Sequence, residues 1–131
     1  MPGETDLQKL LKGIKPKRND GEYVYCVLDN SQTANELSPL CMFQEEEGMT
    51  VIIPKQQADI AALPYSTVLA WITLTIHSSL EAVGLTAAVS NALAEANISS
   101  NVVAAYYHDH LFVSTQDANK AIRVLENISR T

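Results

Sequence analysis

The chain has 131 residues, a mass of 14.3 kDa and a formal net charge of −6. Hydrophobic residues make up 47% of it and charged residues 18%, a balance that supports a packed core and excludes a disordered tail. The acidic charge disfavours a nucleic-acid partner, because phosphate backbones attract basic proteins. Two cysteines are too few for a disulfide framework or a four-cysteine zinc cage, and they fit a reducing cytoplasm.

The first half of the chain begins with a predicted helix and a predicted strand. Residues 5–8, Thr-Asp-Leu-Gln, form a capping box, apolar residues follow at helical spacing, and Pro16 ends the helix. No secretory signal precedes it, because the first six residues are acidic and polar. After a turn at Asn19-Asp20-Gly21, the strand formers of residues 23–28 predict a strand.

A hairpin and a short helix are expected next. Residues 40–46 and 49–54 favour strands on either side of Glu47-Gly48, which predicts a hairpin with a glycine in its turn. Residues 56–63 are consistent with a short helix that ends at Pro64.

The second half shows the clearest periodicity. Residues 70–77 alternate between two faces and predict a strand, so the charge-free stretch 60–80 is not a membrane helix. Ser78-Ser79-Leu80-Glu81 is a second capping box, which predicts a helix start there. The apolar stripe of this helix is Leu85, Ala88, Val89, Ala92, Leu93 and Ala96.

The remaining elements complete a β-α-β-β-α order. Strands are expected at residues 102–107 and 111–114, joined by a turn at His108-Asp109-His110, and the last helix is expected from residue 114. This order predicts helices on one face of a mainly antiparallel sheet. A fourth strand is missing locally, and residues 23–28 are the candidate to supply it.

Three motifs in this half carry a family resemblance. Trp-Ile-Thr-Leu-Thr-Ile-His at residues 71–77, His-Ser-Ser-Leu-Glu-Ala-Val-Gly-Leu-Thr-Ala at 77–87 and Ala-Tyr-Tyr-His-Asp-His at 105–110 resemble the ACT domain, and in particular stand-alone bacterial ACT-like proteins. The regulatory region of aspartate kinases looks similar. The resemblance implies an α+β, ferredoxin-like βαββαβ sandwich, with tandem ACT-like units at residues 1–65 and 66–131 in one intertwined globule.

ACT domains sense amino acids, so the resemblance implies an amino-acid site at the loop between the 70–77 strand and the following helix. A helix start offers backbone N–H groups to a carboxylate, which suits a chain whose interior is nearly free of Lys and Arg. An acidic side chain is then needed for the ligand's ammonium group. The candidate ligand-binding residues are His77, Ser78, Ser79, Leu80, Glu81, Gly84, Leu85, Asp109 and Glu47.

Several of these residues also have simpler explanations. The serines and Glu81 can merely cap the helix, and Gly84 suits either close approach of a ligand or tight helix–sheet packing. His77, His108 and His110 are enough imidazoles for a catalytic zinc, but an Asp in a turn needs no metal. No nucleophile elbow, P-loop or dinucleotide fingerprint is present.

Two classes of function follow. The first is a non-catalytic, cytoplasmic regulatory protein that binds an amino acid or similar zwitterion, forms a homodimer and uses no cofactor, metal, nucleic acid or membrane. The second is an oligomerisation or docking module without a ligand of its own. An enzyme ranks third, because no catalytic constellation stands out.

Overall fold

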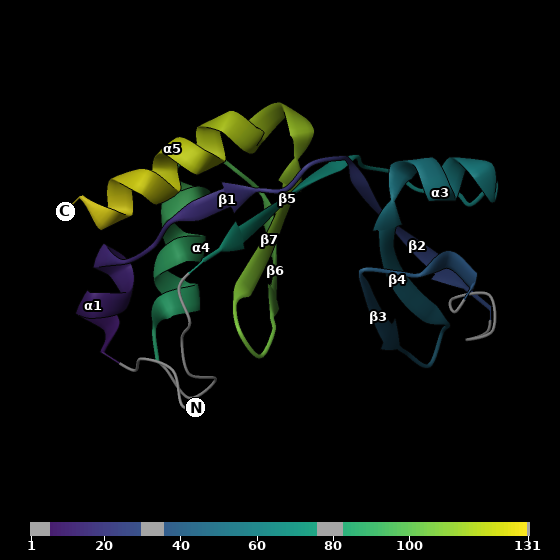
Figure 1. The fold of residues 1–131 in the computed structure, drawn as a ribbon, viewed down its shortest axis with the longest axis horizontal. Coiled ribbons are helices and arrows are strands. Elements are labelled where there is room, and N and C mark those ends of the chain that lie inside the picture. Colours follow the sequence, from purple (N-terminus) through teal and green to yellow (C-terminus); the bar gives the residue numbers. More distant parts are fainter. Residues whose placement is uncertain (1–5, 30–35, 76–82, 131) are drawn as a thin grey trace. The chain divides into compact units, whose positions relative to one another are not determined.

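The computed structural model describes residues 6–29, 36–75 and 83–130, and the chain forms two compact units (Figure 1). Unit 1 combines Met1–Asn19 with Ala70–Thr131, and unit 2 is Asp20–Leu69. By contacts, the first 19 residues group with the C-terminal part of the chain, and the division into ACT-like units at residues 1–65 and 66–131 stays a prediction. Within the described ranges, no helix has the length and apolar character needed to cross a membrane.

Unit 1 contains a sheet with the strand order β1-β5-β7-β6. In this sheet β1 pairs antiparallel with β5, and β6 pairs antiparallel with β7. The helices α4 and α5 connect and follow these strands in the β5-α4-β6-β7-α5 order that the sequence predicts. The bounds are α1 Leu7–Lys12, β1 Pro16–Arg18, β5 Leu69–Leu74, α4 Leu85–Glu95, β6 Ser100–Ala104, β7 Asp109–Ser114, a short 3-10 turn Thr115–Asp117 and α5 Ala118–Ser129.

The fourth strand of this ferredoxin-like sheet is β1, not the Tyr23–Leu28 strand that the sequence analysis selects. Pro16 lies opposite Leu74 and Arg18 lies opposite Ile72. A proline and two basic residues are poor strand formers, but they are tolerated on an edge strand, where one side needs no ladder hydrogen bonds. The Tyr23–Leu28 strand, β2, meets β5 at one pair only, Tyr23 opposite Leu69, and pairs along its whole length with Met49–Pro54 in unit 2.

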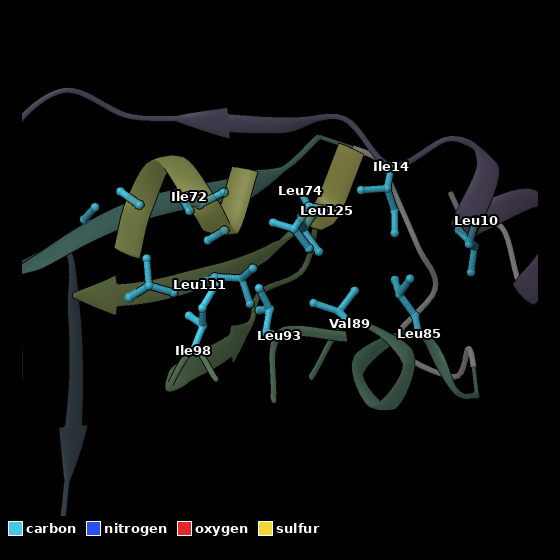
Figure 2. Close-up of a cluster of buried hydrophobic side chains, with 14 residues drawn as sticks. Leu10, Ile14, Ile72, Leu74, Leu85, Val89, Leu93, Ile98, Leu111 and Leu125 are labelled. Atoms are coloured by element: carbon cyan, nitrogen blue, oxygen red, sulfur yellow. The ribbon is translucent and has the colours of Figure 1, made fainter. Parts of the chain in front are cut away.

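One hydrophobic core holds unit 1 together, and Figure 2 shows its side chains converging from strands and helices. Leu85, Val89 and Leu93 are the buried residues of α4, as the predicted apolar stripe requires. Leu10 of α1 is fully buried in the same core, which is why the N-terminal segment belongs to this unit. The buried members are Leu10, Ile14, Ala70, Ile72, Leu74, Leu85, Val89, Leu93, Ile98, Leu111, Val113, Ala118, Ala121 and Leu125.

Two boundaries in unit 1 differ from the sequence analysis. The β6–β7 turn spans residues 105–108 and is closed by the N–H of Ala105, which donates to the carbonyl of His108, so His108 lies in the turn whereas Asp109 and His110 lie in β7. The helix expected from Ser78 begins at Leu85 as α4, and Gly84 precedes it in a left-handed conformation with φ of 96°. A residue in the left-handed conformation cannot be part of a right-handed helix, and glycine adopts it without steric cost, so α4 begins after Gly84.

Unit 2 is a smaller sheet with one short helix. Its strands β2 Tyr23–Leu28, β3 Cys41–Gln44 and β4 Met49–Pro54 have the order β3-β4-β2, and α3 is Lys55–Ile60. The β3–β4 hairpin is confirmed where the sequence predicts it. A side chain at Gly48 would place its Cβ 2.8 Å from Cγ1 of Val27, so only glycine fits this turn. The buried core is Val24, Cys26, Leu28, Met49, Val51, Ile53 and Ala58.

Candidate functional site

Among the residues that the structure describes, no side chain caps the backbone N–H groups at the start of α4. Gly84 is the N-cap residue, and a glycine has no side chain to accept from the first turn. The first bond of the helix runs from the N–H of Ala88 to the carbonyl of Gly84, at 2.9 Å. The three N–H groups before it, on residues 85–87, therefore have no partner within the helix, and they lie at its partly positive end.

The backbone at Gly84 is held close to α1. A Cβ built there would lie 3.1 Å from Cδ2 of Leu7. The atoms nearest to this Cβ all belong to Leu7 of α1, so the close contact at Gly84 is made with α1 and not with the sheet. The left-handed backbone favours glycine at position 84, and a Cβ there would also force the side chain of Leu7 to shift.

The structure places only some of the predicted ligand-binding residues. His77, Ser78, Ser79, Leu80 and Glu81 lie outside the described residues. The side chain of Leu85 is buried in the core, so only its backbone is available to a ligand. Gly84, Leu85 and Asp109 belong to unit 1, whereas Glu47 lies in the β3–β4 turn of unit 2.

Asp109 is a buried carboxyl at the first residue of β7. Since β7 runs opposite to β5 (Figure 1), Asp109 lies toward the end of the sheet where the chain leaves β5 for α4. Loss of hydration raises the pKa of Asp109 above its usual value, and the neighbouring imidazoles of His110 and His108 partly oppose this shift. A cationic group beside Asp109 would favour its ionised form.

A polar network that the sequence analysis does not identify joins β5 to β7. The indole Nε1–H of Trp71 donates to Nδ1 of His110 at 3.0 Å. The hydroxyl of Thr73 lies 3.2 Å from the same nitrogen, and Asn19 Nδ2 donates to that hydroxyl at 2.9 Å. Trp71 and Thr73 share one face of β5. The alternation of residues 70–77 in the sequence already indicates this shared face.

This network governs what His110 can do chemically. Burial lowers the pKa of His110, the nearby His108 lowers it further, and Asp109 opposes the shift. The ring centroids of His108 and His110 are 6.5 Å apart. In the described ranges, no group of three His, Cys, Asp or Glu side chains is arranged to hold a metal ion. The third imidazole of the zinc alternative, His77, lies outside those ranges.

Unit 2 holds the one basic residue that the sequence has between Asn19 and Asn119. Lys55 Nζ lies 2.9 Å from Oδ2 of Asp59, and the hydroxyl of Tyr65 donates to Oδ1 at 2.7 Å. The bond to Asp59 raises the pKa of Lys55, and the bond from Tyr65 lowers the pKa of Asp59. The charged residues Lys55 and Asp59 both border a hollow of about 440 Å³. A carboxylate ligand there would have to compete with Asp59 for the ammonium group.

Comparison with known proteins places these features in a family. Two models of the ACT domain match the chain, one over residues 2–70 and the other over residues 66–127. Among curated proteins, none matches this chain.

Solved structures agree with the family models. A Vibrio cholerae protein of unknown function, described as a possible transport protein, is 41% identical with a TM-score of 0.87, over 94% of this chain and 95% of that chain. An Agrobacterium tumefaciens protein is 19% identical (TM-score 0.60; 88% and 89% covered). The regulatory subunit of aspartate kinase from Thermus flavus is 10% identical (TM-score 0.62; 87% and 96% covered). The last two show a shared fold.

Proposed function

Because this chain belongs to the ACT domain family, we propose that it is a non-catalytic regulatory protein that binds an amino acid at the start of α4. The observation that carries the proposal is the first turn of α4 after Gly84, which no side chain in the described ranges caps. Its N–H groups suit a carboxylate in a chain that has almost no internal cations. The fold shared with an aspartate kinase regulatory subunit supports a regulatory role.

The remaining candidate residues have defined parts in this proposal. The ligand carboxylate accepts from the N–H groups of residues 85–87, helped by the hydroxyls of Ser78 and Ser79. Its ammonium group pairs with Asp109 or Glu81. His77 and Leu80 border the ligand's side chain. Free cysteines at positions 26 and 41 are compatible with the cytoplasm as the site of action.

A thermal-shift screen of the common amino acids at millimolar concentration tests the proposal. A ligand that binds only the folded chain raises the free energy of unfolding, by about 2.7 kcal/mol when its concentration is a hundred times its Kd. The melting temperature must therefore rise. Stabilisation by one amino acid, and none by its decarboxylated amine, supports binding through the carboxylate. No stabilisation by any amino acid contradicts the proposal.

A second function, self-association, is favoured by the edge strand β3. This strand pairs only with β4 among the described elements of unit 2, and it exposes 70% of Phe43 and 47% of Met42. Its four residues carry no charge, and uncharged edges are available for pairing with another chain. In this proposal two copies form a homodimer through β3.

Light scattering tests the dimer with Phe43→Lys, which places a charge on the strand. A wild-type dimer that becomes a monomer in this variant supports the proposal. A wild-type monomer, or a dimer that Phe43→Lys leaves intact, contradicts it. Val83, which is also exposed but lies outside unit 2, provides the matched control as Val83→Lys.

A further inference from the structure

The charged residues of the chain divide unequally between the two compact units. Unit 2, residues 20–69, contains eight acidic residues and one basic residue, Lys55. The other eight Lys and Arg residues all belong to unit 1. Surfaces of opposite charge on one molecule steer unlike surfaces of two molecules toward each other.

The basic residues of unit 1 gather on α1, β1, α5 and the residues next to them. The helix α5 packs against both α1 and β1, and Figure 1 shows the three elements next to one another. Nη1 of Arg18 donates to Oδ1 of Asn119 at 3.4 Å, and Asn119 lies one turn before Arg123 on α5, so the two arginines are neighbours. We call this surface the basic face. Its members are Lys9, Lys12, Lys15, Lys17, Arg18, Lys120, Arg123 and Arg130.

The basic face keeps an excess of positive charge. All eight of its basic residues are exposed, and none forms an ion pair with another residue in the described ranges. Lys120 has a structural role, because its Nζ donates to the carbonyl of Ala96 at 2.6 Å. Carboxylates on the same elements are fewer, so the surface remains available to an anionic partner. These carboxylates are Asp6, Asp117 and Glu126.

The acidic counterpart on this chain is the turn of the β3–β4 hairpin. Three successive glutamates, Glu45, Glu46 and Glu47, are all exposed there. Glu45 accepts a hydrogen bond from Oγ1 of Thr50, whereas Glu46 and Glu47 form no ion pair within the described part of the chain. The exposed ring of Phe43 lies just before them and adds the apolar surface that protein interfaces combine with charged rims.

We propose that the basic face of one copy of the chain docks the glutamate turn of the β3–β4 hairpin of a second copy. Charge complementarity selects this occupant, since both surfaces are present on every copy. The contact joins two different surfaces, so it repeats from copy to copy unless a ring closes. It therefore differs from a β3 homodimer, in which the same strand of both copies meets, and it requires no ligand at α4.

Sedimentation velocity of the full chain over a range of protein concentrations tests the proposal at about 50 mM and about 500 mM NaCl. We expect association that increases with protein concentration and is at least tenfold weaker at the higher salt. The physical reason is screening, because the Debye length falls from about 10 Å at 0.1 M salt to about 3 Å at 1 M. The absence of association, or association that salt leaves unchanged, overturns the proposal.

Charge-reversal variants identify the two surfaces. Arg18→Glu with Arg123→Glu changes the basic face, and Glu46→Lys with Glu47→Lys changes the hairpin turn. We expect each variant alone to lose the salt-sensitive association and an equimolar mixture of the two to regain it. Salt-sensitive association at the wild-type level in a folded variant, or a mixture that does not regain it, overturns the proposal. Glutamine at the same positions replaces any reversal variant that does not fold, with the same expected loss.

A control variant separates these surfaces from net charge. Glu36→Lys with Glu95→Lys changes the net charge as much as the hairpin variant does, at exposed positions outside both surfaces. We expect this variant to keep the salt-sensitive association of the wild type. An equal loss in this variant and in the hairpin variant would show that net charge alone controls association, and would overturn the proposal.

Discussion

The indole of Trp71 donates its N–H to Nδ1 of His110 across the two neighbouring strands β5 and β7. An acceptor at Nδ1 requires the neutral imidazole with its proton on Nε2. The ring centroids are 5.8 Å apart and tilted by 49°. Protonation of His110 at Nδ1 would therefore break this bond as well as place a charge in a half-buried position.

We expect His110 to titrate below the usual histidine pKa. Its pKa is lowered in the folded chain, so the unfolded chain binds the proton first as the pH falls. Stability from this group is therefore present above the unfolded pKa of about 6.5 and is lost on acidification toward the folded pKa. The indole N–H signal of Trp71, the single tryptophan, should shift in an NMR titration with the same midpoint.

A matched variant isolates the contribution of this hydrogen bond. Trp71→Phe keeps an aromatic ring but removes the donor to Nδ1, so the midpoint of His110 should rise toward the usual value. If the wild-type midpoint equals that of an unfolded histidine, or if Trp71→Phe leaves it unchanged, the Trp71–His110 bond does not control this titration.

Gly84→Ala should destabilise the protein by about 1–2 kcal/mol. The left-handed backbone costs about that much for a residue with a Cβ, and the new atom would lie 3.1 Å from Leu7. Chemical denaturation measures the change. Gly84→Asn should cost less, because asparagine tolerates this conformation. Equal stability of Gly84→Ala and wild type would show that the helix start is not as described.

Leu10→Ala should cost about 2–5 kcal/mol, as large-to-small changes in a core do. Leu10 is fully buried among residues of the C-terminal half, so its loss should also lower the cooperativity or midpoint of unfolding followed by Trp71 fluorescence. Lys12→Ala, an exposed change on the same helix, is the control. A loss below about 0.5 kcal/mol, the range of ordinary surface substitutions, would place α1 outside the core of unit 1.

Asp109→Asn should stabilise the free protein at neutral pH and weaken amino-acid binding. Loss of hydration raises the pKa of Asp109 in the folded chain. The stability linked to this carboxyl is therefore complete below the unfolded pKa and declines as the pH rises through the folded pKa. Melting temperatures at pH 7 with and without ligand measure both effects. A lower melting temperature for the free variant, or unchanged ligand binding, would contradict this role.

Local patterns in the sequence were enough to predict most strands and helices. The alternation before Leu74 predicts β5, the spacing of Leu85, Val89 and Leu93 predicts the buried face of α4, and Gly48 marks the hairpin turn. Each of these signals depends on neighbours within a few residues. The order of strands and the resemblance to the ACT domain then lead to the ferredoxin-like fold, which the structure and the comparisons confirm.

Features that depend on contacts between residues far apart in the sequence could not be predicted from local patterns. Pro16–Arg18 forms a strand because the edge of β5 is open to it, and nothing in those three residues predicts that pairing. The Trp71–His110 bond joins residues 39 positions apart. The capping box at Ser78 lies outside the described residues, and α4 begins at Leu85, after the left-handed backbone of Gly84.

We propose that the N–H groups at the start of α4 bind a ligand carboxylate. The most direct test is an NMR titration with the amino acid that gives the largest thermal shift, using wild type, Thr86→Pro and Thr86→Ala. Thr86 is exposed in the first turn, where proline removes one N–H without breaking a hydrogen bond of the helix. We predict saturable shifts at residues 85–87 in wild type and Thr86→Ala, and at least tenfold weaker binding in Thr86→Pro. Equal affinity in a folded Thr86→Pro, or saturable binding that leaves residues 85–87 unperturbed, would contradict the claim.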